Sequence, residues 1–138
     1  MAMGRKARHL LIWALLVSLA GCGFYNDEAL TAKYKLVAVD AREQMALCWD
    51  EGDGVSSFLA GPTLFSAGYD RNYVVAAIHP KGEKAVTQYF YIVRNPKFEA
   101  RRGPSSDDIH GPFNAQEYSK ESARLRLPPF TRTFDDLK

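Results

Sequence analysis

Apolar and polar side chains alternate with a period of two from residue 34 onward, and this period is typical of β-strands. Along residues 34–41, Tyr34, Leu36 and Ala38 share one face, and the opposite face also keeps apolar members. That pattern predicts a strand that is largely buried on both sides. About five to six strands are expected, at 34–41, 44–49, 56–60, 63–67, 73–78 and 86–93. Turn signals between them, at roughly ten-residue spacing, predict an antiparallel β-meander.

The pattern near the C-terminus is typical of a helix instead. Asn114 is a good N-cap, and Glu117 three residues later completes a capping box. The helix is expected to reach about Arg126 and to stop before Pro128, because a proline disfavours helix in the preceding residue. The predicted fold class is therefore α+β: an antiparallel β-meander with one C-terminal α-helix packed on it, forming a single small domain over residues 34–138.

Residues 95–113, between the last predicted strand and the helix, show little periodicity. A loop of this length exceeds the roughly 15 residues that compact domains usually allow, so it is either functional or mobile. It carries charges of both signs and a histidine. The candidate partner-contact residues are Lys97, Arg101, Arg102, Asp107, Asp108 and His110. A solvated loop without a binding role is the alternative interpretation.

The N-terminus has the three-part pattern of a secretory signal. Arg5, Lys6 and Arg8 form a positive region, and the apolar run Leu10–Leu19 follows it. This run has about ten residues, whereas a helix that crosses a bilayer needs about 20. The segment is therefore predicted to direct export rather than to span the membrane permanently.

The tetrapeptide LAGC at Leu19–Cys22 resembles the lipobox of bacterial lipoproteins. The resemblance implies that residues 1–21 are removed and that Cys22 carries diacylglycerol and an acylated amino group. Two or three acyl chains on one residue make a durable anchor, whereas one chain binds only marginally. Residues 22–33 would then be a lipidated tether, with room for one helical turn at 27–32. An ordinary secretory signal that leaves Cys22 as a free thiol is the alternative.

The residue after the lipidated cysteine bears on the destination of the protein. In the lipoprotein family, an aspartate at that position retains many members at the inner membrane. This chain has Gly23 there. The resemblance therefore implies the outer membrane, with the domain facing the periplasm and the lipid on Cys22 as the contact with the bilayer.

The charge of the chain argues against nucleic acid as a partner. Three of the 18 basic residues lie before Cys22, which leaves 15 against 16 acidic residues and a net charge of −1. A protein that binds nucleic acid through its electrostatics keeps a clear basic excess. The length of 138 residues, 46 % of them hydrophobic, suits one small globular domain.

The reactive side chains do not form a recognisable catalytic set. Ser56 or Ser57 with His79 and Asp70 would make a Ser/His/Asp triad only on paper, because no G-x-S-x-G motif accompanies them. His79 is better interpreted as a hydrogen-bonded histidine at the end of a strand. Cys48, between apolar neighbours, is interpreted as a small buried hydrophobe rather than a reactive thiol. Neither a metal nor another cofactor is predicted, and the protein is not expected to be an enzyme.

A fainter resemblance links the chain to an uncharacterised group of small bacterial envelope lipoproteins. The pieces that carry it are Phe65–Asp70, Tyr73–Pro80, Tyr89–Val93 and Gly111–Phe113. These motifs are structural, and the group supplies no activity. Some small lipoproteins of this general appearance are immunity proteins against toxins delivered into the envelope, which is an association rather than a mechanism.

Three functional hypotheses follow. The first is a non-enzymatic protein-binding module of the cell envelope, which contacts another envelope protein through the loop from Lys97 to Pro112 and the exposed sheet face. The second is an immunity lipoprotein that neutralises an effector in the periplasm, and a toxin gene beside this one would favour it. The third is a small envelope hydrolase that uses His79 or His110 with nearby acidic residues. Substitution of both histidines without a phenotype would discard it.

Overall fold

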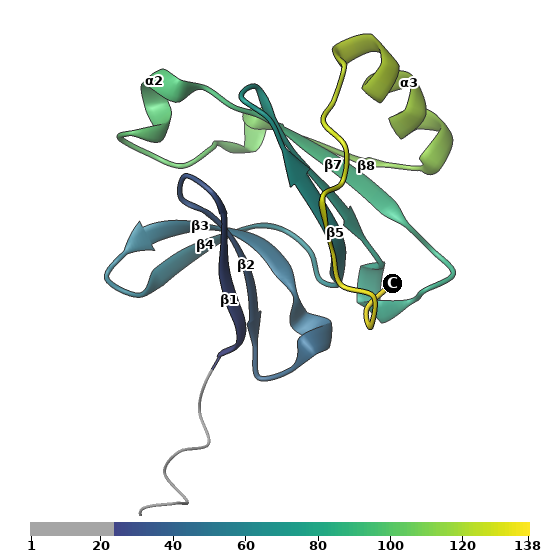
Figure 1. Cartoon of the computed structure of the whole chain (residues 1–138), viewed down its shortest axis with the longest axis horizontal. Helices are drawn as coiled ribbons and strands as arrows, with labels where there is room; N and C mark the ends of the chain where they lie inside the picture. The colour runs from purple at the N-terminus through teal and green to yellow at the C-terminus, as the bar shows by residue number, and fades with distance from the viewer. Residues whose placement is uncertain (1–23) are drawn as a thin grey trace, which may run out of the picture.

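The structure is a computed structural model, and it describes residues 24–138. Within this range the chain forms nine strands in two antiparallel sheets, with its longest helix near the C-terminus (Figure 1). The predicted α+β class is thereby confirmed. The strands outnumber the expected five or six because three segments without clear alternation, which are polar or very short, also join the sheets.

The first sheet has the strand order β1-β2-β3-β4. Its strands are β1 (Phe24–Thr31), β2 (Tyr34–Val39), β3 (Ala46–Gly52) and β4 (Val55–Ala60), and the short 3-10 helix η1 (Arg42–Gln44) lies between β2 and β3. The turn between β3 and β4 centres on Asp53 and Gly54, both with positive φ, as a tight hairpin requires.

The predicted tether over residues 22–33 is wrong for residues 24–31. These residues form β1 and pair antiparallel with β2, so no helical turn forms there. The polar side chains of β1 do not alternate with apolar ones as in a typical strand, because their hydrogen-bond partners lie far away in the sequence. Asn26 donates to a β2 carbonyl oxygen at 2.9 Å, and Glu28 accepts from Arg132 at 2.6 Å. The described part of the fold therefore includes most of the supposed tether.

The second sheet has the order β8-β7-β6-β5-β9. Its strands are β5 (Leu64–Tyr69), β6 (Tyr73–Ile78), β7 (Gln88–Val93), β8 (Ile109–Phe113) and β9 (Arg132–Thr133). The 3-10 helix η2 (Pro80–Gly82) follows β6.

The prediction of an irregular segment over residues 95–113 is wrong for its last part, because Ile109–Phe113 pairs with β7 as strand β8. The preceding residues contain two short helices, α2 (Pro96–Glu99) and η3 (Ser106–Asp108). Strand β8 lies at the edge of the sheet, where a proline is tolerated. Its Gly111 and Pro112 interrupt the alternation of apolar and polar residues by which a strand is identified in a sequence.

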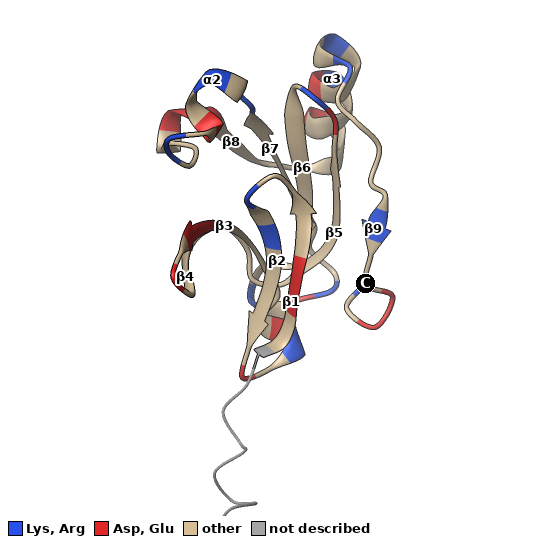
Figure 2. Ribbon diagram, turned by 60° about the vertical axis from the view of Figure 1, so that its left-hand side comes forward, with Lys and Arg blue, Asp and Glu red and all other residues tan. Residues whose placement is uncertain are grey.

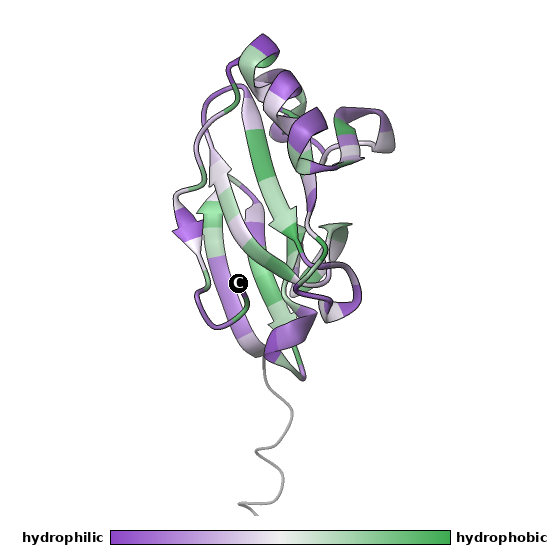
Figure 3. Ribbon diagram, turned by 90° about the vertical axis from the view of Figure 1, so that its right-hand side faces the viewer, coloured by the Kyte–Doolittle hydropathy of each residue, from purple (hydrophilic) through white to green (hydrophobic). Residues whose placement is uncertain are grey.

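The main core lies between the two sheets. Leu36, Leu47 and Trp49 of the first sheet meet Val74 and Ile92 of the second in one buried cluster. Figure 3 shows the most hydrophobic stretches of the strands within the body of the molecule, whereas the loops are mostly hydrophilic. Burial of this apolar surface is the main favourable term that joins the sheets.

The opposite face of the second sheet is covered by α3 (Ala115–Leu125), as Figure 1 shows. The predicted capping box is confirmed. The side chain of Asn114 accepts from the backbone N–H of Glu117 at 2.8 Å, and the carboxylate of Glu117 accepts from the backbone N–H of Asn114 at 3.1 Å. Tyr118, the buried residue of this helix, stacks on Tyr89 of β7 with ring centroids 4.7 Å apart.

The residues after α3 return along the second sheet to its edge. Gly68 of β5 allows this approach, since a Cβ there would lie 2.0 Å from the carbonyl oxygen of Pro129. Strand β9 then pairs with β5. Arg132 reaches across to Glu28 of β1 at 2.6 Å, and Phe134 is buried in the main core. The C-terminal segment therefore contacts both sheets.

Candidate functional site

The candidate site is the segment of residues 94–108, which leaves β7 and returns to the sheet as β8. Figure 2 shows basic and acidic residues of α2 and the following loop close together at one end of the molecule. Five of the six residues that the sequence singles out lie on this segment. We call residues 94–108 the α2 loop.

Arg94 fixes the start of the α2 loop. Its guanidinium donates to both carboxylate oxygens of Glu99, at 2.8 and 3.0 Å, and their side chains are only 11 % and 15 % exposed. The same group donates to the carbonyl oxygen of Asp70 at 2.8 Å and to the hydroxyl of Thr31 at 3.2 Å. One arginine therefore joins the loop to both sheets, and the paired carboxylate is a strong, two-pronged partner.

Local sequence explains the two short helices of the loop. The side chain of Asn95 accepts from the backbone N–H of Lys97 at 3.1 Å, and Pro96 occupies the first helical position of α2. In η3, the carboxylate of Asp108 accepts from the backbone N–H of Ser105 at 2.9 Å. Asp108, a predicted partner contact, is therefore engaged in holding the loop itself.

The middle of the loop lies against the core. Gly103 packs on the indole of Trp49, and a Cβ at this position would come within 2.7 Å of the ring. Trp49 is buried and meets Tyr34 edge-on, with ring centroids 4.9 Å apart. Only glycine permits this approach, so the contact sets the distance between the loop and the first sheet.

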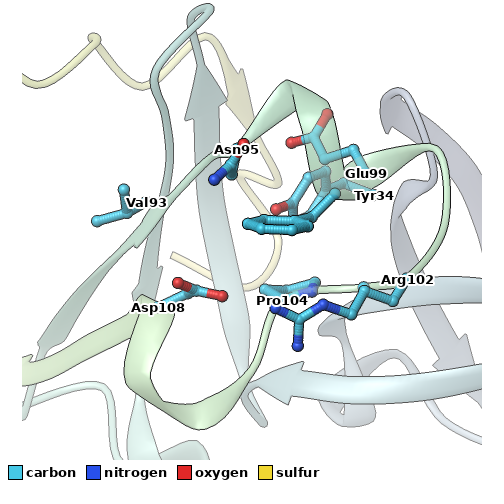
Figure 4. Close-up of a pocket in the computed structure, with 9 residues that line it drawn as sticks. Tyr34, Val93, Asn95, Glu99, Arg102, Pro104 and Asp108 are labelled. Atoms are coloured by element: carbon cyan, nitrogen blue, oxygen red, sulfur yellow. The ribbon is translucent and has the colours of Figure 1, made fainter.

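A small pocket lies beneath the loop, as Figure 4 shows. It is lined by Tyr34, Val93, Asn95, Phe98, Glu99, Arg102, Gly103, Pro104 and Asp108. Its volume of about 10 Å³ gives room for about one water molecule. Burial raises the pKa of the Tyr34 phenol well above its usual range, and the nearby carboxylate of Glu99 adds to the effect. The residues around this pocket support the loop from beneath. The outer surface of the loop is therefore the candidate contact surface.

The outer surface of the loop pairs an aromatic ring with several cations. Phe98 is 46 % exposed, and the guanidinium of Arg102 lies 4.9 Å from its ring centroid. Lys97 and Arg101 are also exposed beside this pair. Glu99 and Asp108 are engaged within the fold, so the surface is basic, with Asp107 as an exposed acidic residue on η3.

The fold brings together only some of the six predicted contact residues. His110 lies on β8 and stacks on Tyr91, with ring centroids 4.7 Å apart, on the face of the second sheet that α3 covers. It therefore belongs to the packing beneath α3. Sequence reasoning missed Phe98 and Arg94. The one signal available for Phe98 was a single large aromatic residue among the charged residues of the loop.

The side chains of the hypothetical triad have separate partners. The hydroxyl of Ser57 donates to Glu51 at 2.6 Å, and the carboxylate of Asp70 accepts from the backbone N–H groups of Asn72 and Tyr73. The Nδ1 atom of His79 lies 2.8 Å from the carbonyl oxygen of Val86, so the interpretation of His79 as a hydrogen-bonded strand-end residue is confirmed. Each group serves its own turn or strand end.

Cys48 is buried on the outer face of the first sheet, in a small cluster with Val37 and Ala46. Burial raises the pKa of its thiol, which disfavours the reactive thiolate. Its interpretation as a small buried hydrophobe is confirmed. Among residues 24–138, no three His, Cys, Asp or Glu side chains gather as metal ligands would.

The predicted signal and its lipidated Cys22 lie outside the described residues. Within residues 24–138, no helix is long and apolar enough to cross a bilayer.

Comparison with known proteins finds no family model, no curated protein and no solved structure that matches this chain.

Proposed function

We propose that the chain is a non-enzymatic protein-binding module, anchored by lipid on Cys22 to the bacterial outer membrane and facing the periplasm. The observation that carries the binding role is the exposed Phe98–Arg102 pair on a loop whose backbone is fixed from beneath. The lipobox carries the location, as the sequence pattern indicates.

The loop has the composition and rigidity of an interface hot spot. Aromatic residues and arginine are enriched at the residues that dominate binding energy. Arg94, Trp49 and the two capped turns hold the loop in one arrangement before any partner arrives. Binding therefore orders little additional chain, and more of the contact energy remains as affinity.

The charges of the loop define the partner. Lys97, Arg101 and Arg102 are exposed, whereas the acidic Glu99 and Asp108 are engaged inward. The complementary surface is an acidic patch around an apolar depression that accepts Phe98. Exposed cations of this kind act mainly on the association rate and on partner choice, and they do so less at high salt.

The position of the loop suits a module that is held at its N-terminus. Strand β1 begins at Phe24, so only Gly23 separates it from Cys22 in the sequence. Thr31, at the other end of β1, contacts Arg94 of the α2 loop. Figure 1 accordingly shows α2 and the start of β1 at opposite ends of the molecule. Eight residues of strand cover about 26 Å at 3.3 Å per residue, which carries the loop away from the anchored end.

Capture from solubilised envelopes tests the binding role. The purified full chain is compared with Phe98→Ala/Lys97→Ala, which removes an exposed aromatic residue and an exposed cation from the loop. The matched control is Phe58→Ala/Lys120→Ala, which removes the same two kinds of exposed side chain from β4 and α3. A discrete envelope protein should be retained by the wild type and by the control and lost, by tenfold or more, with the loop variant. Equal recovery with all three proteins would contradict the proposal.

The anchor is tested separately by labelling with a palmitate analogue. The wild type should take the label and pellet with membranes, and its outer-membrane fraction should exceed its inner-membrane fraction. Cys22→Ala should lose both properties. A Cys22→Ala protein that is still labelled and still sediments with membranes would contradict lipidation at this residue.

A further inference from the structure

The two sheets of the described chain have four edge strands, and three of them carry features that discourage pairing with a further strand. Strand β1 contains the charged residues Asp27 and Glu28, β8 contains Pro112, and β9 has only two residues. Charge, proline and short length are common ways in which proteins protect a sheet edge. The fourth edge strand, β4, has none of these three features.

Strand β4 is an uncharged and accessible edge. Its sequence, VSSFLA, contains no Lys, Arg, Asp, Glu or Pro. Val55, Ser56 and Phe58 are exposed, and Ser57 is half-buried. Its pairing with β3 is regular from Ser56 to Phe58, and irregularities lie on either side of this run. Residues 55–58 therefore form a short strand edge that a further strand can approach.

The outward backbone groups of residues 55–58 have no partner in the described part of the chain. β3 is the one strand that pairs with β4 there, and no other backbone hydrogen bond involves this run. In an antiparallel ladder, alternate residues direct their N–H and C=O groups away from the paired strand. An added strand would bind these groups through its own main chain, which supplies affinity with little dependence on side chains. Phe58→Ala, the control for the α2 loop, therefore leaves this edge in place.

The surface beside this edge is acidic. A hollow of about 170 Å³ is lined by Asp27, Lys35, Val37, Asp50, Gly52, Asp53, Gly54 and Ser56. Lys35, the one cation of this lining, is already paired with Asp27 at 2.6 Å. Asp50 and Asp53 therefore give the hollow an excess of negative charge. Figure 2 shows acidic residues, in red, where β3 turns into β4, and residues 46–60 contain no Lys or Arg.

A basic side chain on an added strand could reach this hollow. Neighbouring strands are about 4.8 Å apart, so an added strand would lie about 10 Å from β3. Ser56 is the Cα partner of Asp50 and would lie between Asp50 and the added strand. Its side chain is small, and the long flexible stem of a lysine can extend across it.

We propose that the edge of β4 receives an extended segment of another protein as a further strand, and that Lys or Arg side chains of this segment face Asp50 and Asp53. A second copy of this chain fits less well, because its own β4 has no basic residue to place near these two carboxylates. The proposal is independent of the α2 loop and of the lipid anchor.

The test uses matched peptide probes on the full chain in detergent micelles. The first probe is a capped peptide of alternating lysine and valine, and the second has glutamate in place of lysine. The third keeps the side chains of the first but has N-methylated backbone nitrogens, which block a strand edge. Each probe is titrated while the backbone amides of residues 55–58 are followed by ¹⁵N correlation and hydrogen exchange.

The lysine probe should shift the amides of residues 55–58 saturably and slow their exchange. The glutamate probe should bind at least tenfold more weakly, because like charges meet at the hollow. The N-methylated probe should neither shift these amides saturably nor protect them.

Asp50→Asn/Asp53→Asn supplies the matched variant. Asparagine keeps the oxygen that accepts from the backbone N–H of Gly52 at 2.8 Å, and it tolerates the positive φ of residue 53. Binding of the lysine probe should weaken by about fivefold, since two exposed ion pairs are lost. Asp107→Asn/Asp135→Asn removes the same charge from two exposed positions elsewhere and should bind as the wild type does.

Three results would overturn the proposal. The first is the absence of any saturable change at residues 55–58 with the lysine probe, and the second is equal binding of the N-methylated probe. The third is protection of these amides in the chain alone, rising with its concentration, which would make a second copy the occupant. All three are read on the wild-type chain, so the test holds even if the double variant fails to fold.

Discussion

The α2 loop and helix α3 lie on either side of β8 in the sequence, and they are held in place by different kinds of contact. Helix α3 is specified locally, since its capping box joins residues three apart. The α2 loop has local turns as well, but distant residues fix its position. Arg94 reaches Thr31, 63 positions earlier, and Gly103 rests on Trp49 of the other sheet.

This difference bears on function. A locally capped helix that covers an apolar sheet face contributes to stability, and its exposed side is of ordinary polar composition. A loop that several long-range contacts hold in one arrangement is expected where a surface must keep a defined shape. The contrast gives four predictions, from the largest expected effect to the smallest.

Arg94→Leu should have the largest effect. It leaves the carboxylate of Glu99, only 15 % exposed, without its cation and breaks the bonds to both sheets. The free energy of unfolding should fall by about 3 kcal/mol, because one member of a largely buried pair is removed. Urea denaturation measures the loss. Hydrogen exchange should show lost protection in the α2 loop, while α3 keeps its own.

The control for that prediction is Arg124→Leu, which breaks the exposed pair with Glu121 on α3. It should leave stability almost unchanged, because exposed ion pairs contribute little. Equal destabilisation by the two substitutions would show that the α2 loop is no more dependent on its ion pair than α3 is.

Gly103→Ala should follow, with a loss of about 2 kcal/mol from overpacking. The new Cβ would lie 2.7 Å from the buried ring of Trp49, so either the loop or the indole must move. Thermal unfolding and the emission of Trp49 should both change. Ser106→Ala, an exposed change in the same loop, is the control and should alter neither. An unchanged melting temperature for Gly103→Ala would refute the tight contact.

Alkaline pH should weaken the attachment of α3. Burial raises the pKa of Tyr118 to about 12, above its ordinary value of about 10. Between these values the unfolded chain releases the phenolic proton and the folded chain retains it. Stability is therefore intact below pH 10 and should fall by about 2 kcal/mol by pH 12. Denaturation at pH 9 and pH 11 measures the slope, which Tyr118→Phe should reduce.

Other buried phenols also act in this range, since burial raises the pKa of Tyr34 and of Tyr91. Tyr118→Phe should therefore reduce the alkaline slope without abolishing it. An identical slope in the wild type and the variant would show that Tyr118 titrates as an exposed tyrosine does.

Asn114→Ala should have the smallest effect, a loss of about 1 kcal/mol from removal of the N-cap. Asn114→Asp preserves a capping oxygen and should restore most of this loss. Circular dichroism during thermal unfolding compares the two variants. If alanine and aspartate were equivalent, the local specification of α3 would be incorrect.

The sequence predicts the parts of the fold that depend on local pattern. Residues 86–93 alternate clearly and contain β7, and the capping box places the start of α3. Strand β1 was not predictable, because its Glu28 finds Arg132 at a separation of 104 residues. Polar residues with distant partners look like those of a solvated tether.

The sequence predicts which segment carries the candidate site, but it does not predict how the side chains of that segment are arranged. The charges of the loop predict that Lys97, Arg101 and Arg102 contact a partner. In the structure these three residues are exposed. The same reasoning also gave His110 a role that the stacking on Tyr91 does not support. No pattern identifies Arg94 as the residue that fixes the loop, because Asp70 and Thr31 become its neighbours only when the chain folds.

The C-terminal segment has a consequence for the order in which the protein matures. Arg132 joins β9 to β1, and Arg42 pairs with Asp136 while lying 5.3 Å from the ring of Phe134. Residues 132–137 include β9 and follow all the remaining strands of both sheets in the sequence, so they are synthesised after the strands that they hold together. A chain truncated before residue 132 would lack Phe134 and Leu137, which are buried in the main core, and its sheets would be left open to proteolysis.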